Sequence, residues 1–347
     1  MPVKRKIVIF TDAWYPQVNG VVTTYTNLIE NIDHELYDVE VIDPSMFKTI
    51  KLPFYKEIQL SICTKDKMQQ IITDLGLVYR FHIATEGPLG LSARSYAVKN
   101  NLPFSTAYHT RFPEYVKART GIPLGITYAF IRWFHAPSMA VMAPTIVVKN
   151  DLENYGINNV VLWSRGVDLD IFKIQDSKSL NTAHPIFLYV GRVAVEKNIN
   201  AFLEIDLPGS KWVVGDGPAL AEIKEKYPNI NYLGVLQQQE LAKVYAAADV
   251  FVFPSKTDTF GLVLLEAMAC GTPVAAYPVT GPIDVLGNSK AGAMNEDLRE
   301  ACLEALRIPR DVARAHAEKF SWKSSTEEFV KHLKPVPTPD VHVTAIA

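Results

Sequence analysis

The sequence predicts an α/β protein of two doubly wound, Rossmann-like domains that face a central cleft. A chain of 347 residues is long enough for two domains of ordinary size. Short apolar, β-branched runs recur in both halves with helical segments between them. The runs are continuous rather than alternating, which is typical of parallel strands covered on both faces. Because such sheets bind ligands beyond the carboxyl ends of their strands, the cleft is the expected site.

The expected strands follow one another in this order along the chain. In the first half they are KIVIF (6–10), YDVEVI (37–42), LVYRFHIA (77–84), PFSTAYH (103–109), TIVV (145–148) and NVVLW (159–163). In the second half they are PIFLYVG (185–191), KWVVGDG (211–217), NYLG (231–234), DVFVFPS (249–255) and TPVAAYPV (272–279).

A polar stretch without clear periodicity, roughly residues 167–184, is expected to link the two domains. The predicted boundaries are therefore 1–170 for the first domain and 183–315 for the second. A last helix is expected over 320–334, where Trp322, Phe329 and Leu333 have helical spacing.

Composition narrows the class of protein. A formal net charge of −2 provides no global field for nucleic acid, so no nucleic-acid partner is expected. The three cysteines, Cys63, Cys270 and Cys302, lack metal-ligand spacing and favour a reducing cytoplasm. The apolar run at the N-terminus is short for a signal peptide, and charged residues and prolines interrupt the apolar stretch 126–148. A cytoplasmic location is therefore expected.

Three loops that follow expected strands carry residues suited to an anionic ligand. Asn19-Gly20 opens an amphipathic helix, and glycine lets a ligand approach a helix N-terminus, although an ordinary strand-to-helix turn also fits. Arg192 and Lys197 in GRVAVEKNIN offer a forked donor and a point charge to a diphosphate, although a solvated surface is the usual role of two basic residues.

The third loop is TDTFGLVLLEAM, residues 257–268. Its helix is expected to present the backbone amides of Thr259, Phe260 and Gly261 to an anionic group. Asp258, just before them, is suited to accept hydrogen bonds from sugar hydroxyls. Glu266, a little over two helical turns further on, is placed to hold a ribose diol.

These motifs resemble the retaining glycosyltransferases of the GT-B fold, specifically glycosyltransferase family 4 (glycosyl transferases group 1). The resemblance covers nearly the whole chain and includes bacterial lipid-sugar transferases that share NGVV and TDTFG. The segments that carry it are PQVNGVVTTYTNL, HIATEGPLG, YHTRFPEY, RGVDLDIF, GRVAVEKN, VVGDGPALAEI, LAKVYAAADVFVFPS and GLVLLEAMACGTPVAAY.

The resemblance implies retaining transfer of a hexose from a GDP- or UDP-sugar to an acceptor hydroxyl, with no metal and no separate cofactor. It implies a membrane lipid or glycolipid as acceptor, with a soluble sugar or polysaccharide as the alternative. The first domain would then serve the acceptor, the second would bind the nucleotide sugar, and the last helix would return to the first domain.

Site roles follow from the same resemblance. The catalytic set would be His109, beside the reacting carbon of the donor sugar, with Arg192 and Lys197 on the diphosphate and Asp258 on the transferred sugar. The donor-binding set would be Gly20, Gly191, Arg192, Lys197, Gly215, Asp258, Thr259, Phe260, Gly261, Leu262 and Glu266, with Gly215 near the base. Two departures are Asp258, where the family usually has glutamate, and Asn19, where many members have glycine.

Other functions fit the sequence less well. An NAD-dependent oxidoreductase would need a G-x-G-x-x-G turn, which is absent. A hydrolase would need carboxylates on opposite sides of the scissile bond, whereas Asp258 and Glu266 share one segment. A non-catalytic sugar-nucleotide sensor would not need the full catalytic set. The DLD string at 168–170 matches a metal-binding pattern of another glycosyltransferase fold, but it opens the linker, and no metal is expected there.

Residues 46–135 hold twelve lysines and arginines against five acidic residues. Lys48, Lys51 and Lys56 are interleaved with apolar residues (Met46, Phe47, Ile50, Leu52, Phe54 and Tyr55), and Lys117, Arg119, Arg132 and Trp133 follow. The pattern predicts contact with an anionic membrane surface, peripheral at its inner face. The alternative is a solvated face over an ordinary core.

Overall fold

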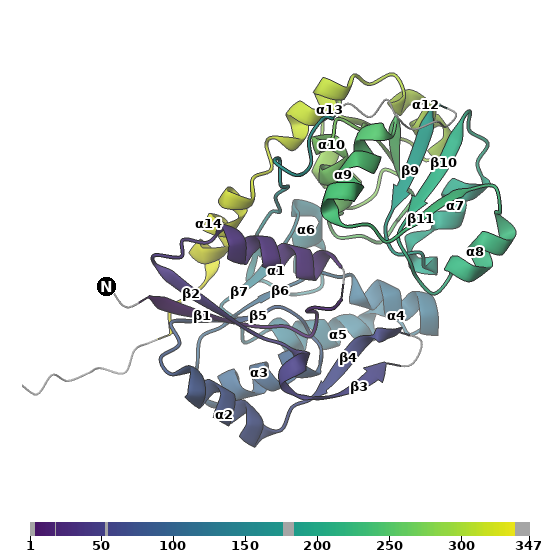
Figure 1. Ribbon diagram of the computed structural model, residues 1–347. Helices are drawn as coiled ribbons and strands as arrows, with labels where there is room; N and C mark the ends of the chain where they lie inside the picture. The colour runs from purple at the N-terminus through teal and green to yellow at the C-terminus, as the bar shows by residue number, and fades with distance from the viewer. Residues whose placement is uncertain (1–3, 18, 53–54, 176–183, 337–347) are drawn as a thin grey trace, which may run out of the picture.

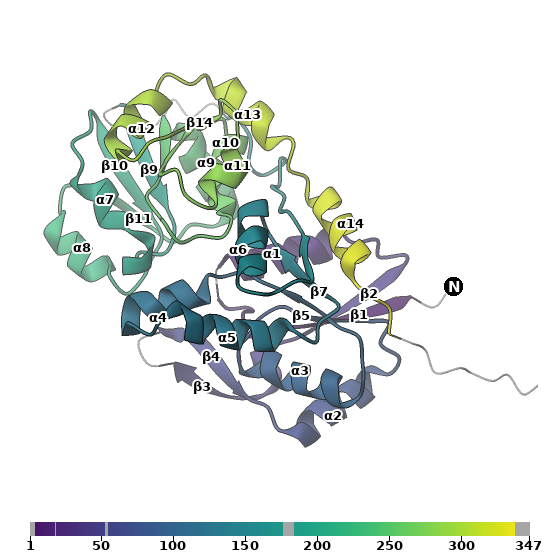
Figure 2. The same ribbon diagram turned by 180° about the vertical axis from the view of Figure 1, so that it is seen from behind.

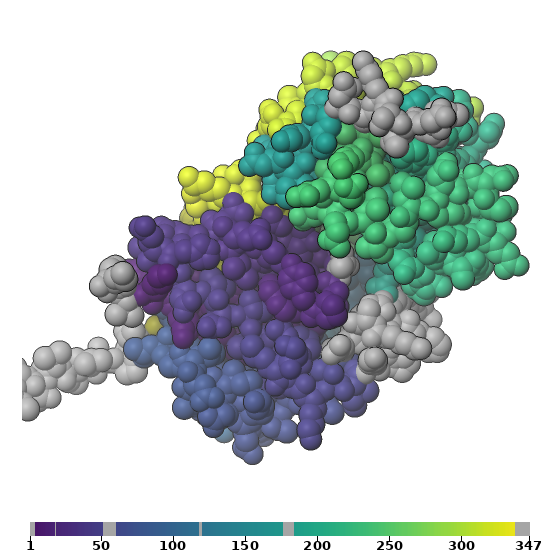
Figure 3. All heavy atoms as spheres, viewed as in Figure 1, coloured from purple at the N-terminus to yellow at the C-terminus, as the bar shows by residue number. Residues whose placement is uncertain are grey.

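The computed structural model describes residues 4–17, 19–52, 55–175 and 184–336, and it contains two parallel-sheet domains (Figure 1). The predicted fold class is confirmed. The space-filling view shows the first domain, in purple and blue, in contact with the second, in green (Figure 3). Among the described helices, none is long and apolar enough to cross a membrane.

The first sheet has six strands in the order β2-β1-β5-β6-β7-β8, and every pairing is parallel. The strands are β1 (Arg5–Phe10), β2 (Tyr37–Ile42), β5 (Arg80–Ile83), β6 (Ser105–Ala107), β7 (Ala140–Ala143) and β8 (Val160–Leu162). The helices of this half are α1 (Gly20–Asn31), α2 (Lys65–Leu75), α3 (Pro88–Lys99), α4 (Phe112–Thr120), α5 (Leu124–His135) and α6 (Ile146–Asn154).

The second sheet has the order β11-β10-β9-β12-β13-β14, which is the order of dinucleotide-binding folds. Its strands are β9 (Ile186–Val190), β10 (Ser210–Val214), β11 (Asn231–Gly234), β12 (Val250–Phe253), β13 (Val274–Ala276) and β14 (Gly292–Met294). The helices of this half are α7 (Ile199–Glu204), α8 (Leu220–Lys226), α9 (Gln238–Ala247), α10 (Leu262–Ala269), α11 (Pro282–Leu286), α12 (Leu298–Ala305) and α13 (Arg310–Ala317).

Each sheet has a point where the strand order reverses, and this point positions the site. In the second sheet β9 and β12 are neighbours although strands β10 and β11 lie between them in the chain, so the loops after β9 and β12 open a crevice at the same edge. The loop after β9 carries Arg192 and Lys197, and the loop after β12 carries Asp258. In the first sheet the reversal lies between β1 and β5, and the loop after β1 leads to Gly20.

Two details differ from the expected elements. The run TIVV begins helix α6 instead of a strand, because the Thr145 hydroxyl accepts a hydrogen bond from the Val148 amide (3.2 Å) and caps the helix, while the buried β7 fills the strand position. An antiparallel hairpin, β3 (Lys48–Leu52) and β4 (Tyr55–Ile62), and strand β14 are additional to the expected strands.

The segment after β8 and the last helix connect the domains. The expected linker is not entirely polar and loose: Val167 and Phe172 are buried in the core of the second domain, and residues 176–183 lie outside the described residues. Helix α14 (Trp322–His332) lies beside α1 on the first domain (Figures 1 and 2). Phe329 and Leu333 enter the core of that domain, and the Trp163 indole N–H donates to the Ser325 carbonyl (3.0 Å).

Candidate active site

An ion pair stands at the second domain's side of the cleft. The Lys197 ammonium, after β9, is bonded to the Asp258 carboxylate, after β12, and the two side chains are only 23% and 17% exposed. Burial is the largest single effect on the pKa of Lys197 and lowers it, but the charge and hydrogen bond of Asp258, together with Tyr115 and Tyr189, raise that pKa overall. Lys197 is therefore a fixed cation. The other carboxylate oxygen of Asp258, Oδ2, is buried and has no hydrogen-bond partner among the described residues.

Unpaired backbone donors lie next to this carboxylate. The amides of Thr259, Phe260 and Gly261 donate no hydrogen bond to any residue that the structure describes. Gly261 has φ +86° and begins α10 without a side-chain cap. This left-handed conformation favours glycine and turns the chain so that α10 starts at the cleft. A helix start with free amides suits an anionic group.

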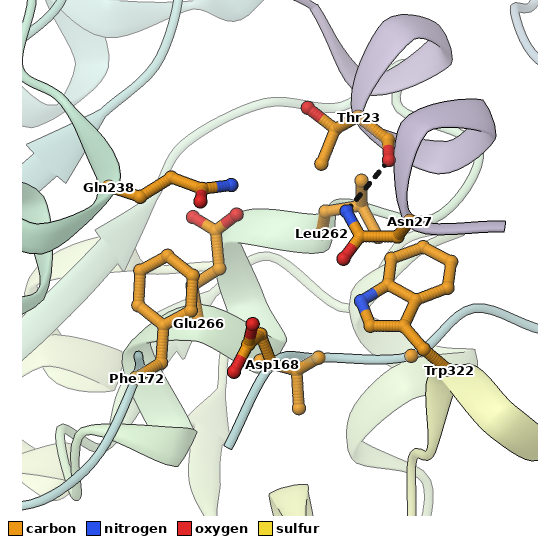
Figure 4. Close-up of a pocket in the computed structure, with 10 residues that line it drawn as sticks. Thr23, Asn27, Asp168, Phe172, Gln238, Leu262, Glu266 and Trp322 are labelled. Atoms are coloured by element: carbon orange, nitrogen blue, oxygen red, sulfur yellow. Dashed lines mark hydrogen bonds between the residues drawn. The ribbon is translucent and has the colours of Figure 1, made fainter. Parts of the chain in front are cut away.

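Glu266 lies one turn into α10 and lines a narrow pocket between the domains. Its carboxylate accepts a hydrogen bond from the Tyr245 hydroxyl of α9 (3.0 Å). Figure 4 shows the carboxylate directed between Gln238 of α9 and helix α1, from which Thr23 and Asn27 come. Burial raises the pKa of Glu266 to about 7, although the Tyr245 hydrogen bond lowers it in part.

Two glycines bring the strand ends of the second domain close together. Gly215 has φ +126°, and a Cβ there would lie 2.0 Å from the Gly191 carbonyl oxygen. Any side chain at Gly215 would therefore push apart the loops after β9 and β10. Arg192, next in the chain, is half-buried in the first of these loops. These glycines are required for close backbone packing, whatever they bind.

The first domain contributes the start of α1. The Asn19 side chain accepts hydrogen bonds from the amides of Val21 (3.0 Å) and Val22 (3.1 Å), so this residue caps helix α1. A Cβ on Gly20 would lie 3.9 Å from Leu262 of α10. The starts of α1 and α10 therefore face each other across the cleft.

His109, after β6, joins the domains through its backbone: the Thr259 hydroxyl donates to its carbonyl oxygen (2.7 Å). Its ring nitrogens bond within the first domain, Nε2 with the Tyr25 hydroxyl (3.0 Å) and Nδ1 with the Arg165 guanidinium (3.3 Å). Burial and the Arg165 charge hold the pKa of His109 well below its usual value. In this conformation neither ring nitrogen is available to a donor sugar.

Several polar residues of this region were absent from the sequence prediction. Tyr25, Tyr245 and Arg165 are fully or almost fully buried, and Tyr115 of α4 lies close enough to Lys197 and Asp258 for their charges to act on its pKa, which burial raises. A tyrosine inside an apolar helix pattern is predicted to be an ordinary core residue, so the sequence alone does not indicate a polar role for Tyr25 or Tyr245. Arg165 stands in the RGVDLDIF segment.

Other polar residues that could hold a ligand, including the DLD string, have structural partners. His82 and His135 are fully buried, and His135 Nε2 lies 3.3 Å from Glu86. In the DLD string, the Asp168 carboxylate accepts hydrogen bonds from the backbone amides of Asp170 (2.9 Å) and Ile171 (3.0 Å) and so closes a local turn. No cluster of three histidine, cysteine or acidic side chains that could hold a metal occurs within the described ranges.

Comparison with known families follows the division of the chain. The family described as "Glycosyltransferase Family 4" matches residues 18–171, and "Glycosyl transferases group 1" matches residues 184–308. The chain belongs to the family 4 glycosyltransferases. The two matched regions contain the two sheets in turn, so family membership and fold agree.

Relatives of known name include glycosyltransferases of membrane lipids. The chain is 29% identical to the sulfoquinovosyl transferase of Arabidopsis thaliana over 89% of its own length, but it spans only 65% of that protein. It is 27% identical to the alpha-monoglucosyldiacylglycerol synthase of Streptococcus pneumoniae, over 94% of this chain and 84% of that one. It is 26% identical to a GDP-mannose-dependent alpha-mannosyltransferase of Corynebacterium glutamicum, over 95% and 89%.

Solved structures share the fold at low sequence identity. The sucrose-phosphate synthase of Thermosynechococcus elongatus has a TM-score of 0.76 at 17% identity, over 94% of this chain and 98% of that one. Anabaena HepE in complex with UDP-glucose has a TM-score of 0.68 at 14% identity, also over 94% and 98%. At these identities the likeness shows the GT-B fold alone.

Proposed function

We propose that this family 4 glycosyltransferase transfers a hexose from a GDP- or UDP-sugar to the hydroxyl of a membrane lipid or glycolipid, with retention of anomeric configuration. One observation carries the donor assignment. Within the part of the chain that the structure describes, the buried Asp258 Oδ2 has no hydrogen-bond partner, and neither have the three amides beside it. Buried polar atoms are rarely left unpaired, so this site requires a ligand that both donates and accepts hydrogen bonds. The hydroxyls and phosphate of a nucleotide sugar supply both.

The proposed reaction breaks the bond between the anomeric carbon and the diphosphate oxygen. A new bond forms between the same carbon and the acceptor oxygen, on the same face, and the acceptor proton passes to the departing phosphate. Positive charge develops on the sugar and negative charge on the phosphate. Lys197, Arg192 and the amides that start α10 stabilise the negative charge, so the proposed reaction needs no metal ion.

Turnover with defined substrates tests this proposal. The purified chain is incubated with UDP-glucose, UDP-galactose or GDP-mannose and with dispersed diacylglycerol or a soluble sugar, and the product's anomeric configuration is read by NMR. Transfer to diacylglycerol with the donor's configuration is expected. An inverted product contradicts retention. Transfer to the soluble sugar alone would assign a soluble acceptor in place of the lipid. Donor binding without any transfer would indicate a sugar-nucleotide sensor.

The acceptor assignment has its own structural support in the first domain. Exposed apolar side chains lie on α4, on the connection to α5 and on α5: Phe112, Ile122, Ile126 and Trp133 are 46%, 38%, 65% and 52% exposed. Lys117 and Arg132 of the same elements are also exposed. Apolar side chains that can enter the interface, beside basic residues, suit an anionic lipid surface. A peripheral position at the inner face of the cytoplasmic membrane follows as part of the proposal.

Not all of the basic region contributes to this surface. Arg80 donates to the Val330 carbonyl (3.1 Å), Arg94 to the carbonyls of Trp133 and Phe134, and Arg111 pairs with Asp151. Phe47 packs against the core. Phe54 lies outside the described residues, and so do the side chains of Lys51, Leu52, Tyr55, Lys56 and Arg119.

Vesicle co-sedimentation tests the surface. Binding to vesicles with anionic lipid is expected, with a loss at high salt and on the change Ile126→Ser. Leu36→Ser, which alters a similarly exposed residue (50%) before β2, is the matched control and should bind normally. Equal and negligible binding to anionic and neutral vesicles would leave the soluble acceptor as the better choice.

A further inference from the structure

Five polar side chains form one continuous hydrogen-bonded chain from the cleft into the core of the first domain. Arg165 contacts His109, His109 contacts Tyr25 (3.0 Å), Tyr25 contacts His82 Nε2 (2.7 Å), and His82 Nδ1 contacts the Ser105 hydroxyl (2.8 Å). Four of the five are at least 95% buried. Such a chain is stable only if every link has one donor and one acceptor.

The cation at one end determines the direction of every link. A guanidinium has N–H donors and no acceptor, so Nδ1 of His109 must be unprotonated where it meets Arg165. A neutral imidazole then carries its proton on Nε2 and donates it to the Tyr25 oxygen. The Tyr25 hydroxyl must in turn donate to His82 Nε2, and His82 must hold its own proton on Nδ1, facing Ser105.

We propose that Arg165 is a positioning residue that fixes His109 as the neutral Nε2–H tautomer and, through Tyr25, fixes the tautomer of His82. The inference rests on the proposed function only for its catalytic meaning, because a neutral imidazole does not oppose positive charge that develops on a neighbouring sugar. The tautomers themselves follow from the hydrogen bonds.

The surroundings of Arg165 keep its guanidinium in place. The residue is 4% exposed, its guanidinium carbon lies 4.0 Å above the Trp163 ring, and it donates to the carbonyls of Trp163 and Ser164. Burial lowers the pKa of Arg165 to about 10, so it remains a cation at neutral pH. The other charged groups that act on this chain are Glu328, near Arg165, and Glu86, near Tyr25.

The same charge keeps the histidines from titrating. Burial, followed by the charge of Arg165, lowers the pKa of His82 to about 3. Burial, Arg165 and His82 together hold the pKa of His109 well below 6.5. Both rings are therefore neutral throughout the range in which a free histidine titrates. The low pKa values agree with the tautomers that the geometry requires.

Nitrogen-15 NMR of histidine side chains tests the inference without any turnover. The chain has eight histidines, and His109→Gln and His82→Gln assign the two signals by their loss. In the full-length protein, His109 should show an unprotonated Nδ1 and a protonated Nε2, with no titration between about pH 5.5 and 8. A protonated Nδ1 on His109 would overturn the inference at once.

Arg165→Met should release this constraint. His109 should then populate both tautomers, its pKa should rise toward the ordinary 6.5, and kcat should fall on the order of 10- to 100-fold. Arg94→Met is the matched control, because Arg94 also stacks on a tryptophan (3.9 Å from the Trp133 ring) and donates to two carbonyls, away from His109. An unchanged His109 spectrum in folded Arg165→Met contradicts the proposal.

Tyr25→Phe provides a second variant if Arg165→Met fails to fold. It keeps the ring but removes the link between the histidines, so His82 should gain the second tautomer while His109 Nδ1 stays unprotonated. An unaltered His82 spectrum contradicts the proposed chain. If the wild-type protein transfers no sugar at all, the proposed function fails, but the tautomer measurements still decide this inference.

Discussion

Glu266→Gln separates the two effects of a carboxyl group that is hard to ionise. The change keeps the shape of the side chain, and the Tyr245 hydroxyl can still donate to the amide oxygen. It removes only the negative charge. The variant therefore tests both the stability of the free protein and the proposed bond to the donor's ribose.

Burial sets the size of the effect on stability. A carboxyl whose pKa rises from 4.5 to about 7 costs roughly 3 kcal/mol to ionise in the folded protein. Below pH 4.5 the group is protonated in both the folded and unfolded states and has no effect. Between pH 4.5 and about 7 the carboxyl of Glu266 ionises only in the unfolded chain, so the wild-type free energy of unfolding falls as pH rises. Above pH 7 the whole loss of roughly 3 kcal/mol is present.

Donor binding should depend on pH in the opposite direction. A ribose diol donates to the ionised carboxylate, so wild-type affinity for a nucleotide sugar should increase as pH rises to about 7 and then level off. The variant should bind about tenfold or more weakly at pH 8 and should show little change with pH, because a charged acceptor contributes roughly 1.5–3 kcal/mol.

Urea unfolding and calorimetric titration with the donor, at several pH values from 5 to 8.5, measure the two effects on the same samples. Glu240→Gln, an exposed acidic residue in α9, is a suitable control and should match the wild type. Equal donor affinity in wild type and Glu266→Gln at pH 8 would remove the ribose role. A wild-type stability that does not fall between pH 4.5 and 7 would refute the burial argument.

Three further predictions concern the ion pair, metals and the last helix. Lys197→Met should abolish most turnover and also lower the free energy of unfolding by about 3–5 kcal/mol, because Asp258 loses its counter-ion. The double variant Lys197→Met, Asp258→Leu should regain stability in thermal unfolding but should not regain activity. Activity should survive EDTA because protein side chains neutralise the leaving group, and a loss reversed by manganese or magnesium would contradict this. Phe329→Ala should lower the unfolding free energy by about 3–5 kcal/mol, whereas Lys331→Ala on the same helix should have little effect.

The fold was predictable because two signals agree along the whole chain. Continuous apolar runs such as IFLYV and VFVF give strands buried on both faces, and they occur at regular intervals between helices. The failures are local. TIVV has the composition of a strand, but the Thr145 hydroxyl at its start caps a helix. The apolar composition of a segment does not indicate whether such a capping hydrogen bond forms.

The site was predictable only where it follows strands. Lys197 and Asp258 are 61 residues apart in sequence, yet both come after neighbouring strands of one sheet, so strand order brings them together. Tyr245 lies inside a helix and gave no such signal, whereas Arg165 follows the edge strand β8 but was assigned no role. Their contacts depend on tertiary packing, which places Tyr245 against Glu266 and Arg165 against His109, pairs that no motif spacing connects.

The pair Asp258 and Glu266 shows how this packing gives two acids of one short motif different surroundings. Both carboxylates belong to one twelve-residue segment, but each takes its partner from a distant element: Asp258 meets the ammonium of Lys197, and Glu266 meets the neutral phenol of Tyr245. Burial raises the pKa of Glu266 to about 7, so this carboxyl group ionises only near neutral pH. In the proposed function the two acids therefore act differently on one donor: Asp258, paired with Lys197, meets the transferred sugar, and Glu266 ionises near neutral pH to accept hydrogen bonds from the ribose diol.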